Sequence, residues 1–119
     1  ASGSLIIKIK SNFSSVAVGS QAIDELTVRQ MILFGQEILR IAGLRLLSYE
    51  LTHEAPDELR LNVADGFTLI VKRDDNPEAV AQILRTVLIE EIKDRISQVD
   101  YIDLRFGNKV FYKWKGGIK

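Results

Sequence analysis

Few side chains in this sequence combine the types and spacing that catalysis or metal binding requires. The only histidine, His53, precedes Glu54, but a zincin-type metal site needs a second histidine. The acidic pairs Asp24-Glu25, Asp74-Asp75 and Glu90-Glu91 fall at expected helix ends or on a polar helix face, where the helix dipole or solvent accounts for them. No nucleophile has a base nearby in the sequence, and no glycine cluster has the spacing and lysine of a phosphate loop. We therefore expect a non-enzymatic protein with no catalytic residue, metal site or cofactor.

The C-terminal part of the sequence predicts a β-hairpin with an open edge. Residues 101–106 and 109–114 have the composition of two short strands, and Gly107-Asn108 between them suits a tight primed turn. The few residues after Trp114 are too short a segment to supply a further strand, so we expect the outer edge of the last strand to stay open. An open edge can pair with an extended segment of another chain. The hairpin is therefore the expected partner site.

A two-residue turn fixes which residues of the hairpin face each other. The expected pairs are Phe106 with Lys109, Arg105 with Val110, Leu104 with Phe111, Asp103 with Tyr112, and Tyr101 with Trp114. One face would then gather Ile102, Leu104 and Phe111, and the other would gather Tyr101, Asp103, Arg105, Val110, Tyr112 and Trp114. The second face has the residue types of interface anchors. Two alternatives stay open: Tyr112 and Trp114 pack on a neighbouring helix, or a bulge at the turn exchanges the two faces.

Charge is balanced over the chain but uneven near its end. The formal net charge is zero, yet every charged residue after Asp103 is basic. These residues either protect an edge strand against aggregation or attract an acidic partner segment. Because Phe111, Tyr112 and Trp114 are interleaved with lysines, a single-stranded nucleic-acid-binding module is the alternative function. The net charge of zero disfavours nucleic-acid binding, so no nucleic acid is expected as a partner.

The rest of the sequence predicts the elements that position this hairpin. Strands are expected at residues 5–10, 13–18, 46–53, 59–64 and 67–71, and the last two would form a hairpin across Asp65-Gly66. Apolar residues at helical spacing predict one helix from Asp24 to Gly43 and another from residues 74–77 to Ile96. Gly35, within the first helix, hints at close packing against a strand. These elements predict an α+β fold, with a mixed sheet, two amphipathic helices on one face and the C-terminal hairpin at an edge.

Length and composition predict one domain. The chain has 119 residues, of which 46% are hydrophobic, and this suffices for one core. We expect the domain to cover residues 5–119 and the opening residues 1–4 to be a cloning remnant. No run of about eighteen apolar residues suggests a membrane span.

Several of these segments together resemble a known bacterial family. The motif Tyr101-Ile102-Asp103-Leu104-Arg105-Phe106, followed by a short turn and a last strand, resembles the end of the extracytoplasmic β domain of the cell-division protein FtsQ, called DivIB in Gram-positive organisms. Upstream, residues 18–21 before the first helix and the hairpin at residues 59–71 agree with this resemblance, which extends from about Leu5 to Trp114.

The resemblance implies a non-enzymatic scaffold of the divisome that acts in septum formation. It implies recruitment of FtsB (DivIC) together with FtsL, by addition of a partner strand beside the last strand. It also implies a plasma-membrane protein whose transmembrane helix and POTRA domain precede this extracytoplasmic domain and are not in this chain, so that contact with the membrane is only through that helix. The implied partner-binding residues are Arg105, Phe106, Asn108, Lys109, Val110, Phe111, Tyr112, Lys113 and Trp114.

Overall fold

The computed structural model describes residues 7–10, 25–52, 55 and 57–116. The elements are β1 (Ile7–Lys10), α1 (Glu25–Glu37), β2 (Leu46–Thr52), β3 (Glu58–Val63), β4 (Thr68–Lys72), α2 (Pro77–Val87), β5 (Val99–Phe106) and β6 (Lys109–Trp114). Each helix continues into a π-helical turn, η1 (Ile38–Ala42) after α1 and η2 (Leu88–Ile92) after α2. A short 3-10 helix, η3 (Ile96–Gln98), leads into β5.

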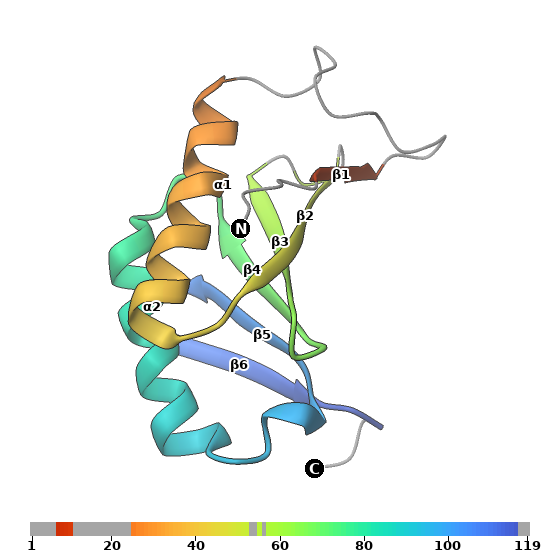
Figure 1. The fold of residues 1–119 in the computed structure, drawn as a ribbon, viewed down its shortest axis with the longest axis vertical. Coiled ribbons are helices and arrows are strands. Elements are labelled where there is room, and N and C mark those ends of the chain that lie inside the picture. The colour runs from red at the N-terminus through yellow and green to blue at the C-terminus, as the bar shows by residue number, and fades with distance from the viewer. Residues whose placement is uncertain (1–6, 11–24, 53–54, 56, 117–119) are drawn as a thin grey trace.

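The six strands form one mixed sheet in which spatial order follows chain order, from β1 at one edge to β6 at the other. The β1–β2 and β4–β5 pairs are parallel, and the β2–β3, β3–β4 and β5–β6 pairs are antiparallel. Figure 1 shows the two edge strands far apart, with β6 beside the C-terminal half of the second helical segment. The predicted α+β fold with a mixed sheet is confirmed.

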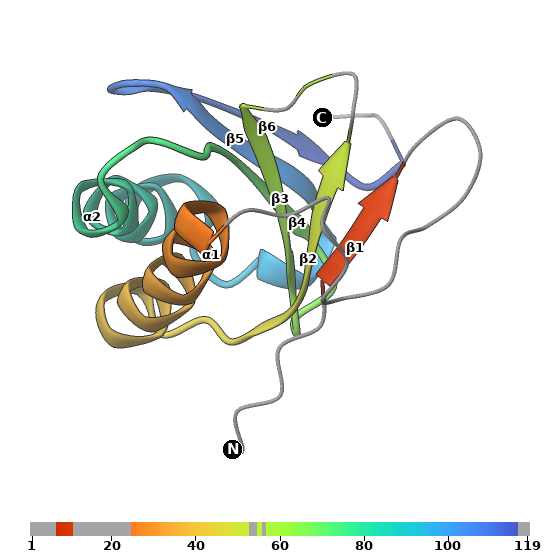
Figure 2. The same ribbon diagram turned by 90° about the horizontal axis from the view of Figure 1, so that it is seen from above.

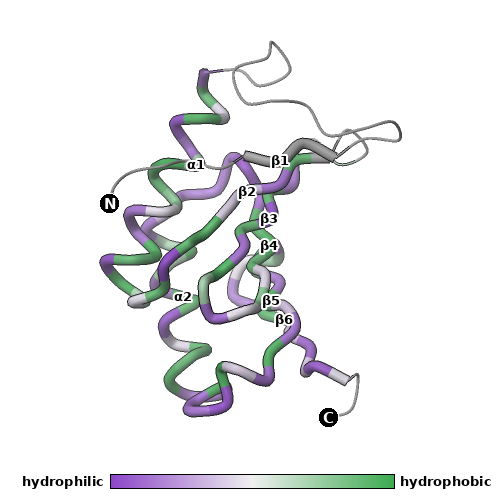
Figure 3. Tube along the Cα trace, turned by 45° about the vertical axis from the view of Figure 1, so that its right-hand side comes forward, coloured by the Kyte–Doolittle hydropathy of each residue, from purple (hydrophilic) through white to green (hydrophobic). Residues whose placement is uncertain are grey.

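Both helices cover the same face of the sheet, as Figure 2 shows from above. The core between the two layers takes Met31, Phe34 and Ile38 from the first helical segment, with Val80, Leu84, Val87 and Ile92 from the second. The sheet contributes Leu59, Leu61, Val63, Leu69, Val71, Ile102 and Leu104, all at least nine-tenths buried. Hydrophobic and hydrophilic segments alternate along both helices in Figure 3. This pattern is typical of a helix that buries one stripe and exposes the other.

Most predicted elements are found close to their expected bounds. The hairpin β3–β4 turns at Asp65-Gly66, and Gly66 takes a positive φ of 104°. The first helical segment ends at Gly43, which caps it with a left-handed φ of 76°. Some expectations lie outside the described residues: the cloning remnant, the strand at residues 13–18, Asp24 at the start of the first helix, and the His53-Glu54 dipeptide.

The second helix begins within the predicted range, residues 74–77, but its helical segment ends earlier than predicted. It begins at Pro77, because the side chain of Asn76 caps it by accepting a hydrogen bond from the Ala79 N–H at 3.1 Å. The prediction that its apolar stripe continues to Ile96 is wrong. Lys93 takes a positive φ of 58°, its N–H donates to the Leu88 carbonyl at 2.7 Å, and the chain then turns toward β5. Neither described helix has the length and apolar composition of a membrane span.

Gly35 is a point of close approach between α1 and the sheet. A Cβ built on Gly35 would lie 2.5 Å from the hydroxyl oxygen of Tyr49 on β2, whereas the next atom, Cζ of the same ring, would lie at 3.8 Å. Tyr49 is buried, and burial raises the pKa of its hydroxyl. The close packing that the mid-helix glycine suggested is therefore found, and one hydroxyl group is its cause.

We predict that Gly35→Ala destabilises the domain by about 2 kcal/mol, because overpacking costs more than the gain of about 1 kcal/mol in helix propensity. In a Tyr49→Phe background the same change meets no close atom, so it is expected to be neutral or stabilising. Denaturant unfolding of the two single variants and the double variant measures this coupling. Equal costs of Gly35→Ala in both backgrounds would contradict the explanation.

Candidate functional site

The pairing of β5 with β6 differs from the pairing expected for a regular hairpin. Phe106 pairs with Lys109 across the predicted two-residue turn, and Gly107 takes a φ of 66° there. Beyond the turn, the register shifts between Asp103 and Phe106, because β5 spans three residue steps where β6 spans only two. The observed pairs are Asp103 with Phe111, Ile102 with Tyr112, Tyr101 with Lys113, and Val99 with Trp114.

This shift exchanges the two faces of β6 relative to β5. The predicted pairs Arg105 with Val110, Leu104 with Phe111, Asp103 with Tyr112, and Tyr101 with Trp114 are therefore wrong. An extra residue in one strand of a hairpin changes the parity of every pair beyond it, since side chains alternate with a period of two. Val110, Tyr112 and Trp114 share the helix-covered face with Ile102 and Leu104 and pack against the core. Phe111 and Lys113 lie on the opposite, helix-free face with Tyr101, Asp103 and Arg105.

Trp114 is a packing residue of the helix-covered face. Its ring lies edge-to-face against Tyr112 with centroids 5.4 Å apart, and the guanidinium carbon of Arg95 lies 4.5 Å from its centroid. The hydroxyl of Tyr112 donates to Oε1 of Glu91 at 3.3 Å. Partial burial, together with the charge and hydrogen bond of Glu91, raises the pKa of Tyr112. The expectation that Tyr112 and Trp114 share a face with Asp103 and Arg105 is therefore wrong. The alternative, that they pack toward a helix, is confirmed.

The outer backbone edge of β6 is unpaired within the part of the chain that the structure describes. The N–H of Lys115 donates to the Gln98 carbonyl at 2.7 Å, and Lys109 closes the two-residue turn with Phe106. Backbone groups alternate in direction along a strand, so the odd-numbered residues between these positions direct theirs toward β5. Val110, Tyr112 and Trp114 therefore direct their N–H and C=O groups outward.

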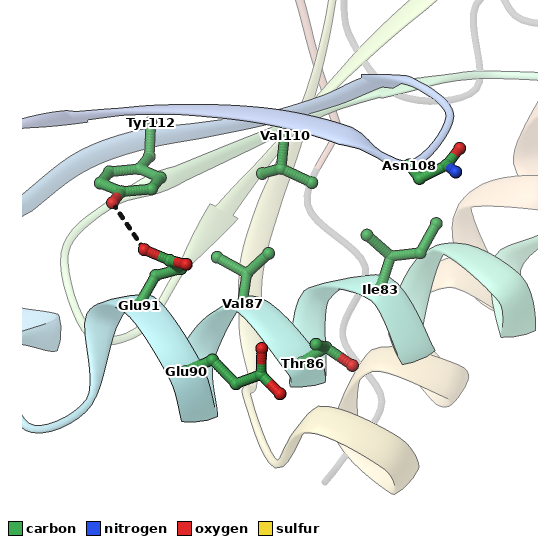
Figure 4. A pocket seen from close by; sticks show the side chains of 8 residues that line it. All are labelled: Ile83, Thr86, Val87, Glu90, Glu91, Asn108, Val110 and Tyr112. Atoms are coloured by element: carbon green, nitrogen blue, oxygen red, sulfur yellow. Dashed lines mark hydrogen bonds between the residues drawn. The ribbon is translucent and has the colours of Figure 1, made fainter.

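A groove of about 540 Å³ lies beside this edge, between β6 and the second helical segment. Its lining consists of Ile83, Thr86, Val87, Glu90, Glu91, Asn108, Val110 and Tyr112. In Figure 4 the side chains of Val110 and Tyr112 point from β6 toward the helix, and those of Ile83 and Val87 point back toward the strand. The two glutamates lie further along the same helix, and Glu91 meets the hydroxyl of Tyr112. Sequence reasoning did not connect the five helical members to the hairpin, because only the fold brings them beside it.

The helix-free face of the hairpin exposes aromatic and basic side chains. Phe106 and Phe111 are 50% and 55% exposed, and their rings meet edge-to-face with centroids 5.5 Å apart. Lys109 and Lys113, on either side of Phe111 along β6, are exposed and form no ion pair with the described residues. Of the predicted partner-binding residues, these four are the ones with side chains free for contact on this face, while Asn108 is exposed in the turn.

Arg105 is held by acids of its own chain. Its guanidinium contacts Asp103 at 2.7 Å and 2.9 Å and Glu58 at 3.2 Å, and its backbone N–H donates to Asp103 at 3.1 Å. Burial of Asp103 acts to raise the pKa of its carboxyl, but the hydrogen bonds and charge of Arg105, with the charge of Arg60, outweigh this and hold the pKa below its ordinary value. The motif residue Arg105 therefore stabilises β3 against β5 and remains only partly exposed.

Within the described residues, no group of three or more His, Cys, Asp and Glu side chains is placed to hold a metal ion. The acids that do cluster, Glu58 and Asp103, share the guanidinium of Arg105. The arrangement found beside β6 instead suits the pairing of an extended chain: free backbone groups, an adjoining groove, and exposed aromatic and basic side chains.

We predict that Trp114→Ala lowers the free energy of unfolding by about 2 kcal/mol, because the indole is packed between the core, Tyr112 and Arg95. Phe111→Ala, at an exposed position on the other face of β6, is the matched control and is expected to cost less than about 0.5 kcal/mol. Urea unfolding of the two variants provides the measurement. A Trp114→Ala variant as stable as the parent would show that the indole contributes nothing to the fold.

We also predict that Asp103→Asn costs about 2 kcal/mol at neutral pH, since it removes a carboxylate that accepts charge-assisted hydrogen bonds. A lowered pKa means that this contribution is complete above the ordinary pKa of an aspartate and is lost as the pH falls through the lowered value. The stability difference between parent and variant should therefore shrink on acidification. Unfolding curves recorded from neutral pH down to about pH 3 would show this. A difference that stayed constant would contradict it.

No protein-family model matches this sequence, and no curated protein sequence matches it closely enough to count as a relative.

Proposed function

We propose that this domain is a non-enzymatic docking module that recruits a partner by addition of a β-strand to β6. By resemblance to the FtsQ/DivIB β domain, the proposed partners are FtsB (DivIC) and FtsL, and the proposed setting is the extracytoplasmic side of the plasma membrane at the division septum. The motif at residues 101–106 and the terminal hairpin support this assignment.

The open edge of β6 is the observation that carries the proposal. Three alternate residues, Val110, Tyr112 and Trp114, direct away from the sheet backbone groups that no other described residue pairs with. Main-chain hydrogen bonds to such groups supply affinity for an added strand, and pockets for its alternate side chains supply specificity. The groove beside Val110 and Tyr112 is a pocket of this kind.

The geometry supports strand addition better than the alternative, binding of single-stranded nucleic acid. A stacking platform needs several aromatic rings on one face together with basic side chains. Here the two faces of β6 separate these groups, because Tyr112 and Trp114 turn toward the helix whereas Phe111 and the lysines remain on the other side. Tyr112 also donates to an acid, Glu91.

Proline substitution tests whether the partner pairs with the backbone of β6, because proline has no N–H to donate. In Val110→Pro the lost N–H points outward, so the domain should stay folded while its affinity for the extracytoplasmic segment of FtsB falls by more than about tenfold. Val110→Ala removes nearly the same side-chain packing but keeps the N–H, and it should bind like the parent. Isothermal titration with the segment, together with circular dichroism of each variant, makes the comparison.

A proline at a position whose N–H points toward β5 serves as an internal control. The N–H of Phe111 points toward β5, so Phe111→Pro should break the hairpin, whereas Phe111→Ala should not. If Val110→Pro stayed folded and bound the FtsB segment as tightly as Val110→Ala does, strand addition at β6 would be wrong.

A further inference from the structure

A strand added beside β6 would meet opposite charges on its two faces. On the helix-free face, Lys109 and Lys113 are exposed and have no ion-pair partner among the described residues. On the other side of the edge, the exposed Glu90 and Glu91 line the groove. Among the described residues Glu91 accepts a hydrogen bond from Tyr112, and neither glutamate forms an ion pair. Beside Val110 and Tyr112 the edge therefore separates a basic surface from an acidic one, whereas beside Trp114 the guanidinium of Arg95 adds a positive charge on the helix-covered face.

Strand geometry converts this separation into a rule for the partner. In an added antiparallel strand, the residues that hydrogen-bond to Val110 and Tyr112 have their side chains on the same face as those two residues, over the groove. The intervening residues of the added strand have their side chains on the helix-free face, beside Lys109, Phe111 and Lys113.

We propose that β6 selects a partner strand whose two faces carry opposite charge, with acidic side chains toward Lys109 and Lys113 and basic side chains toward Glu90 and Glu91. This inference rests on the proposed strand addition and deepens it by naming the kind of strand that fits. A slip of one residue exchanges the faces of the added strand and places like charges beside each other, which is unfavourable. The charges thereby fix the register of a strand whose backbone alone would pair in either of two ways.

The test uses a synthetic peptide of alternating Glu and Lys, at least as long as the six residues of β6. Such a peptide has no net charge, so long-range attraction does not bias the comparison. Reversal of the basic surface by Lys109→Glu with Lys113→Glu leaves like charges beside the peptide in either register, and binding should weaken roughly tenfold. Reversal of the acidic surface by Glu90→Lys with Glu91→Lys should have a similar effect.

Reversal of both surfaces together is the decisive variant. It restores opposite charges once the peptide exchanges its faces, so affinity should return to within about threefold of the parent value. The control for reversal of the basic surface alone is Arg29→Glu with Arg45→Glu, at two exposed positions on α1 and in the loop before β2. It changes the net charge by the same amount as Lys109→Glu with Lys113→Glu and should leave affinity unaltered. Fluorescence anisotropy of a labelled peptide gives all these affinities.

Disulfide trapping reads the register directly, because the chain has no native cysteine. In Phe111→Cys the introduced thiol lies on the helix-free face, at a position whose backbone points toward β5, where a residue of the added strand approaches to about 4.5 Å between Cα atoms. The parent surfaces should trap a peptide with a cysteine among its glutamates. The doubly reversed surfaces should trap one with a cysteine among its lysines.

The outcomes separate the charge rule from strand addition itself. Strand addition stands if Val110→Pro abolishes binding of the FtsB segment. In that case the charge rule is overturned if none of the three reversals changes the affinity for the peptide, or if the peptide does not bind at all. If Val110→Pro leaves binding of the FtsB segment unchanged, the proposed function itself fails. The charge rule is supported if the doubly reversed variant regains affinity for the peptide and traps the peptide with a cysteine among its lysines.

Discussion

The register shift between Asp103 and Phe106 decides what the terminal hairpin presents on each of its faces. Without it, Tyr112 and Trp114 would lie on the helix-free face with Arg105, and Phe111 would face the helix instead. With it, Val110, Tyr112 and Trp114 extend the core toward the edge of the sheet. As a result, the same residues of β6 pack against the core with their side chains and direct their backbone groups away from the sheet.

The lysines along the open edge of β6 oppose pairing with some strands and permit pairing with others. An unpaired edge strand invites aggregation, and lysines along it are a common protection. Lys109 and Lys113 supply this protection against a second copy of the same edge, because like charges would then meet on one face. A strand with acidic side chains on that face meets no such barrier. In the proposed strand addition, protection and selectivity thus come from the same two side chains.

The groove depends on packing that lies away from the hairpin. The second helical segment ends where Lys93 adopts a positive φ, after a π-helical turn that contains both Glu90 and Glu91. Its buried residues Leu84, Val87 and Ile92 fix this segment against β5, and its outer residues consequently line the space beside β6. Arg105 contributes from the other face of the sheet, where its ion pairs with Glu58 and Asp103 join β3 to β5.

The sequence alone determined the elements, because local periodicity, Gly43, Asp65-Gly66 and Asn76-Pro77 act through neighbouring residues. It also indicated the two-residue turn and the close approach at Gly35. The faces of β6 could not be predicted, since one extra residue in β5 reverses all pairs beyond it and leaves no mark in the alternation of either strand. The groove could not be predicted either. Glu90 and Glu91 are more than fifteen residues before β6 in the chain, and only the packing of the helix on the sheet brings them to its edge.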